Sequence, residues 1–147
     1  MPKLDLDALP EISRSGYLGA YKDAVAGRSW KQLGQGLTDL GVNLVTLKPG
    51  AASSQRHWHV AEDEVVYMLS GEAVLIEDDG ETPLKPGDVA VWPKGVPNGH
   101  QIVNRSDADC VMLAIGTNFP DADQCHYPDI DQFWSQATGY VRKSELG

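Results

Sequence analysis

Short apolar runs separated by turn residues recur between residues 41 and 116. The runs are rich in Val, Leu and Ile, and turn tripeptides such as Lys48-Pro49-Gly50 and Lys85-Pro86-Gly87 lie between them. Runs with this composition and these boundaries predict β-strands. Many short strands at close spacing favour an all-β sandwich or barrel over a sheet with helix crossovers. We expect the strands at 41–47, 65–69, 72–77, 81–84, 88–92, 101–104 and 110–115.

The two ends of the chain lack such a pattern. Residues 1–40 show no sustained period, although they contain aromatic residues such as Tyr17 and Trp30. We expect an irregular or edge-strand arm that packs along the barrel of its own or of a neighbouring subunit; the alternative is a partly mobile tail. Residues 130–136 predict one short helix, with Asp129 as its N-cap. The expected organisation is an N-terminal arm over 1–40, a barrel over 41–117 and a C-terminal extension with a short helical tail over 118–147.

Composition narrows the class of partner and the compartment. A chain of 147 residues is long enough for one domain with its own core. Its net charge of −9 comes from 21 acidic and 12 basic residues, so we expect neither nucleic acid nor an anionic membrane surface as a partner. The sequence shows no signal-peptide pattern and no apolar run near the ~20 residues that span a bilayer. We therefore expect a cytoplasmic protein in which Cys110 and Cys125 are free thiols.

Two histidines and a glutamate lie close together after the first predicted strand. Alternate side chains of an extended strand share a face, so His57 and His59 point the same way. A short connection lets Glu64, which opens the next strand, face them. We expect the fourth ligand to be His100, since it also opens a strand-like run. Imidazole and carboxylate together suit a divalent Fe, Mn, Zn or Ni ion; the alternative is a set of hydrogen-bonded polar residues on a sheet surface.

The segment from Gly50 to Gly71 resembles the first motif of the cupin superfamily, which contains a glycine, a His-x-His pair, a glutamate and a closing glycine. A second segment, from Gly87 to Asn104, resembles the second cupin motif. It has four residues, 96–99, before His100 where the family has two, but His100 and Asn104 keep the family's mutual spacing. The resemblance implies a jelly-roll β-barrel with one metal ion held by His57, His59, Glu64 and His100.

The same alternation predicts the surroundings of the ion. Gln55, Met68 and Ile102 share the faces of the ligand residues on their own strands. Asn98 lies in the lengthened loop, where it could hydrogen-bond a substrate; the alternative, which we favour, is a turn asparagine. Together these residues predict a small, mostly apolar substrate pocket with a few polar groups. His126 has no partner at a suitable ligand spacing and is left out of the site.

Two classes of function are consistent with this site. The first is a metal-dependent enzyme acting on a small polar substrate, a sugar or a carboxylate; the resemblance implies dioxygenase, isomerase, decarboxylase or lyase chemistry without choosing among them. The second is a small-molecule-binding or sensing cupin without turnover. A DNA-binding regulator is disfavoured because the chain has no helix-turn-helix pattern and no basic face. We favour the enzyme, and we expect a homodimer because aromatic residues occupy outward positions of the barrel.

Overall fold

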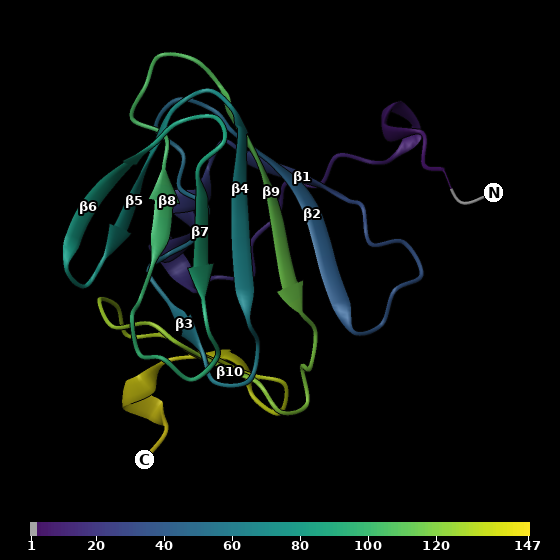
Figure 1. Cartoon of the computed structure of the whole chain (residues 1–147). Helices are drawn as coiled ribbons and strands as arrows, with labels where there is room; N and C mark the ends of the chain where they lie inside the picture. The colour runs from purple at the N-terminus through teal and green to yellow at the C-terminus, as the bar shows by residue number, and fades with distance from the viewer. Residues whose placement is uncertain (1–2) are drawn as a thin grey trace.

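The computed structural model describes residues 3–147 and shows strands wrapped into a barrel (Figure 1). The strands form a five-stranded sheet in the order β1-β2-β9-β4-β7, a three-stranded sheet β6-β5-β8 and a four-stranded sheet β12-β11-β10-β3. Their bounds are β1 Arg28–Gln32, β2 Leu40–Leu47, β3 Trp58–His59, β4 Glu64–Ser70, β5 Ala73–Glu77, β6 Gly80–Leu84, β7 Val89–Trp92, β8 Gln101–Val103, β9 Cys110–Thr117, β10 Gln124–His126, β11 Phe133–Ser135 and β12 Gly139–Val141.

Each strand predicted between residues 41 and 116 forms, as β2 and β4 to β9, with ends within two residues of those expected. Strand β4 shows why these apolar runs form strands. Val66 and Met68 are buried, whereas Tyr67 and Leu69 between and beyond them are exposed. An alternation of this kind is stable only when one face of the strand packs on a core. The predicted all-β jelly-roll barrel is confirmed.

The core lies between the five-stranded and the three-stranded sheets. The five-stranded sheet contributes Leu47, Met68 and Met112, each exposed by 1% or less, and the three-stranded sheet contributes Leu75 and Ile102. All are inward residues of their strands, so the two inner faces interdigitate as in other sandwiches. The two sheets therefore pack against each other through one apolar core.

The N-terminal arm adds an edge strand to the barrel. Strand β1 pairs antiparallel with β2, with Arg28 opposite Leu47 and Trp30 opposite Val45. The arm also holds two short 3-10 helices, η1 (Leu6–Ala8) and η2 (Gly19–Val25), and a third, η3 (Lys143–Glu145), lies near the C-terminus. None of the helices among residues 3–147 is long and apolar enough to cross a membrane. The edge-strand form of the predicted arm is thus the one observed.

The helix predicted over residues 130–136 is wrong. Phe133 to Ser135 form strand β11, which pairs with β10 on one side and with β12 on the other. Aromatic residues such as Phe133 and Trp134 suit a strand as well as a helix, and here two neighbouring strands satisfy the backbone on both sides. Because β10 also pairs with β3, the C-terminal extension covers the strand that carries His59 (Figure 1). The tail is helical only at η3.

Candidate metal centre

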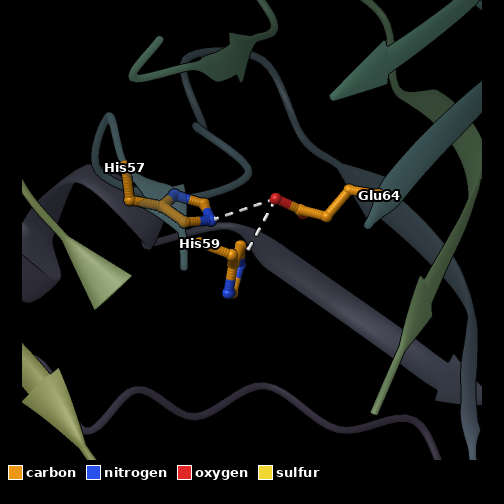
Figure 2. A group of neighbouring side chains, drawn as sticks. All are labelled: His57, His59 and Glu64. Carbon is orange, nitrogen blue, oxygen red and sulfur yellow. Dashed lines mark ion pairs between the residues drawn. The ribbon is translucent and has the colours of Figure 1, made fainter. Parts of the chain in front are cut away.

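The four residues predicted as metal ligands meet around one carboxylate oxygen. Glu64 Oε1 lies 2.9 Å from His100 Nε2, 3.3 Å from His59 Nε2 and 3.8 Å from His57 Nε2. Figure 2 shows His57 and His59 turned toward Glu64 from the strand facing it. The nitrogens and the oxygen converge from three segments of chain, and His57, His59 and Glu64 among them could hold a metal ion.

Local backbone structure explains the convergence. His57 forms an antiparallel bridge with His100, with N–H to carbonyl distances of 3.2 and 3.0 Å. Two residues on, His59 lies on the same side, and the two imidazole centroids are 5.0 Å apart. Trp58 points away and stacks on His126 at 4.5 Å. The alternation predicted for this strand therefore places the side chains as expected.

All three imidazoles are held by their Nδ1 atoms. Nδ1 of His57 lies 2.9 Å from the Gln55 carbonyl, and Nδ1 of His100 lies 3.1 Å from the Asn98 carbonyl. Nδ1 of His59 lies 2.6 Å from Asp123 Oδ2. Carbonyl and carboxylate oxygens only accept, so each ring donates through an Nδ1–H, which leaves Nε2 as the atom that faces Glu64 and that is available to an ion once it carries no proton. Such partners orient histidine ligands in metalloproteins.

The charge states differ across the cluster. Burial lowers the pKa of His57 to about 4, so its ring is neutral at pH 7. Burial alone would raise the pKa of Glu64, but the hydrogen bond from His100 and the neighbouring imidazoles lower it to about 2. Burial likewise opposes charge on His59, but the hydrogen bond to Asp123 raises its pKa to about 11. A bound cation would replace the proton of His59, as metal binding generally releases protons.

The family model that matches this sequence is the cupin domain, over residues 43–116. The matched segment takes up half of the chain and includes all four converging residues. The chain belongs to the cupin family.

This cupin resembles several known proteins. A solved structure of a sugar phosphate isomerase from a cupin superfamily, from Silicibacter pomeroyi, is 45% identical, covers 98% of this chain and 94% of that chain, and has a TM-score of 0.91. A structure from Acidithiobacillus ferrooxidans is 31% identical, with 82% and 79% covered and a TM-score of 0.74. An oxalate-binding protein from Thermotoga maritima is 34% identical over 67 residues, which are 46% of this chain. The cupin spans about half (54%) of the length of that curated relative.

The donor set of this cupin fits a divalent metal ion. Ligand atoms of His57, His59 and Glu64 lie within 4.8 Å of one another, and mixed imidazole and carboxylate donors suit Fe, Mn, Zn or Ni. A second group, His59, Asp123 and Cys125, meets the same distance limit. In this group Asp123 Oδ2 already lies 2.6 Å from Nδ1 of His59. Asp123 is better placed as the residue that orients His59.

A cavity of about 250 Å³ adjoins the ligand residues. His57, Glu64 and His100 form part of its wall, and Trp92 stacks on the His100 ring at 3.9 Å. The remaining wall consists of inward residues of the five-stranded sheet, of β8 and of the segment before β3: Arg28, Trp30, Asn43, Val45, Ser53, Ser54, Val66, Ile102, Met112 and Ala114. The metal ligands and a space of small-molecule size are therefore parts of one site.

Of the four residues predicted to line a substrate pocket, one lies in the cavity wall and three do not. Ile102 lies in the cavity wall. Gln55 does not, because its side-chain amide donates to the Tyr21 carbonyl, and Met68 is fully buried in the core. Asn98 lies outside the wall as well: its amide donates to Glu77 and its oxygen accepts from the backbone of residue 78. Asn98 is thus a turn asparagine, the alternative that the sequence favoured.

Sequence reasoning missed Arg28 and Asn43 in the cavity wall, and Asp123 behind His59. The sequence contains a pattern that could have identified Arg28 and Asn43. Arg28 and Trp30 alternate on a short run that could be assigned as a strand, and Asn43 lies inside a predicted strand. Whether the side chains of Arg28 and Asn43 face the cavity or the solvent depends on the register in which β1 pairs with β2. The local sequence pattern does not determine that register.

Proposed function

We propose that this cupin is a metal-dependent isomerase of a small sugar phosphate or a similar hydroxy-carbonyl compound. The observation that carries the proposal is the convergence of three imidazole nitrogens on Glu64, with Glu64, His57 and His100 in the wall of a cavity of about 250 Å³. Such a site can bind an ion and a small molecule side by side. Likeness to the Silicibacter pomeroyi isomerase, 45% identical over 98% of this chain, favours isomerisation among the reactions that cupins perform.

A divalent ion held by His57, His59, Glu64 and His100 would supply a Lewis acid that polarises a substrate carbonyl. The residues of the chain then have separate tasks. Trp92 and Ile102, both largely buried, form apolar wall that limits water around the reacting carbons.

Glu64 is the residue suited to moving the proton. It is the only carboxylate in the wall of the cavity, and its Oε2 accepts no hydrogen bond from residues 3–147. With a pKa of about 2 it is anionic at neutral pH but a weak base, so it can take a proton only from a carbon acidified by a polarised neighbouring carbonyl. Returning that proton to the adjacent carbon, while the proton of the substrate hydroxyl passes to the former carbonyl oxygen, completes an isomerisation without an oxidant or a reductant.

The test is proton NMR of the protein loaded with Mn, Fe, Zn or Ni and incubated in D2O with aldose and ketose phosphates. We expect interconversion with deuterium incorporated at the carbon next to the carbonyl. Glu64→Gln with retained metal should abolish both, and Glu72→Gln, at an exposed glutamate outside the cavity wall, should change neither. Absence of isomer with all four metals would refute the proposal.

The second candidate is a binding protein without turnover for small dicarboxylates. The 34% identity to the oxalate-binding protein favours it, although that likeness spans only 67 residues. Calorimetric titration of the metal-loaded protein with oxalate separates the two functions. Stoichiometric binding of oxalate without any isomerisation would replace the first proposal with the second.

A further inference from the structure

Arg28 places a positive charge in the wall of the cavity that also contains the metal ligands. It is the first residue of β1, and its guanidinium lies over the ring of Trp30, 5.0 Å from the centroid. The family match begins at residue 43, so Arg28 belongs to the part of the chain outside the common cupin unit. Its presence in the cavity is therefore not part of the shared metal motif.

The guanidinium of Arg28 is held by neutral groups only. Its Nη1 donates to the Ser53 carbonyl and its Nη2 to the Arg14 carbonyl, both at 2.8 Å. Its Nε is buried and finds no acceptor within the described chain. A guanidinium offers five N–H groups, so these two bonds leave three for another partner.

No carboxylate in residues 3–147 forms an ion pair with Arg28. The contrast with other arginines is clear, since Arg56 pairs with Asp78 and Asp129 and Arg105 pairs with Glu81. The sequence contains 21 acidic residues, so counterions are not scarce. A largely desolvated charge without a counterion is costly, and such a charge is retained where a ligand supplies the missing anion.

Neutral hydrogen-bonding groups accompany Arg28 in the wall. The Asn43 side chain makes no hydrogen bond to any residue that the structure describes. The hydroxyl of Ser53 accepts from the backbone of Ile102 and lies 3.5 Å from the hydroxyl of Ser54, a contact in which either oxygen could donate. Burial lowers the pKa of Arg28 from its ordinary value, which reflects the desolvation, but an arginine remains charged at any physiological pH.

We propose that Arg28, together with Asn43 and Ser53, binds an anionic group of the substrate, a carboxylate or a phosphate, while another part of the same molecule lies at the metal centre. This assignment rests on the proposed function in taking the cavity as the substrate site. Arg28 is then the residue that selects anionic over neutral substrates.

The experiment compares three small probes, glycerol, glycerate and glycerol 3-phosphate, in calorimetric titrations of the protein with and without Zn. The wild type should bind at least one of the two anions more tightly than glycerol, and the anion preferred identifies carboxylate or phosphate as the group recognised. Arg28→Gln should weaken binding of that anion by about 10- to 100-fold, the usual range for a charge-assisted hydrogen bond. Binding of Zn should remain unchanged.

Arg14→Gln is the matched control, because this exposed arginine carries the same charge and also lies over Trp30, at 5.9 Å, but is not in the cavity wall. It should bind the anions as the wild type does. Arg28→Lys keeps a cation and should keep part of the preference even if Arg28→Gln folds poorly. Equal binding of anions by Arg28→Gln and wild type, or no preference in the wild type, would overturn the assignment. Failure to bind Zn, Fe, Mn and Ni alike would instead refute the metal-dependent function while leaving the anion comparison intact.

Discussion

Replacing Asp123 with asparagine tests whether the C-terminal extension orients a metal ligand. Asp123 is 3% exposed and accepts hydrogen bonds from His59 Nδ1 at 2.6 Å, from the backbone N–H of Ala61 at 2.9 Å and from Cys125 Sγ at 3.9 Å. Asparagine keeps the shape of the side chain but turns one oxygen into a donor. One of the two N–H groups must then face another N–H group, so either the ring of His59 or the Ala61 backbone loses its partner.

The size of the effect follows from that loss. A hydrogen bond to a charged acceptor contributes about 1.5–3 kcal/mol. If the loss falls on His59, it weakens a ligand that has to present Nε2 to the ion, and partners of this kind are worth about 10- to 100-fold in metal affinity. At about 1.4 kcal/mol for each factor of ten, the two ranges agree. We therefore expect Asp123→Asn to weaken binding of Zn by about 10- to 100-fold.

Competition with a chelator measures the affinity, and Asp121→Asn, at an exposed aspartate of the same segment, is the control. Thermal unfolding of the metal-free proteins is measured in parallel, because Asp123 also attaches the extension to β3. An affinity within twofold of wild type would refute the reasoning. It would do so most clearly if the metal-free variant were destabilised, since Asp123 would then act only as an anchor of the extension.

Three further outcomes are expected. Met68→Ala should lower the free energy of unfolding in urea by about 2–5 kcal/mol, because the side chain is fully buried in the core; a loss below about 1 kcal/mol would contradict the packing described. Arg56→Ala should lower the free energy of unfolding by about 1 kcal/mol at pH 7, after allowance for solvent screening. Arg56 lowers the pKa of Asp129 in the folded protein, so this contribution is complete above the unfolded value of about 3.9 and is lost as pH falls through the folded pKa; an equal cost at pH 2 and pH 7 would refute it. Light scattering should give twice the 15.9 kDa subunit mass, and Val91→Asp, on an exposed apolar position of β7, should give monomers; a monomeric wild type at micromolar concentration would exclude the dimer.

The parts of the fold that could be predicted from the sequence are those that depend on neighbours along the chain. Alternation in 57–59 places two imidazoles on one side, and the turn that follows brings Glu64 opposite them. The strands between residues 41 and 116 likewise have local patterns and clear turn residues. The helix expected at 130–136 does not form, because the structure of this segment depends on pairing with the strands before and after it. Its residues are held by β10 and β12, and a local pattern does not show that such partners exist.

Residues brought to the site by long-range pairing carry no local signal. Asp123 lies 64 positions from the histidine it contacts, and Arg28 enters the cavity only because β1 pairs with β2. Both lie outside the segment 43–116 that defines the family. The likeness to the oxalate-binding protein extends over 67 residues, whereas the structure aligned over 98% of the chain also takes in the flanking segments. In this cupin Arg28 and Trp30 of the N-terminal flank complete a cavity wall whose other residues belong to the segment 43–116. Variants of Arg28 are therefore the ones that we expect to change specificity while the metal stays bound.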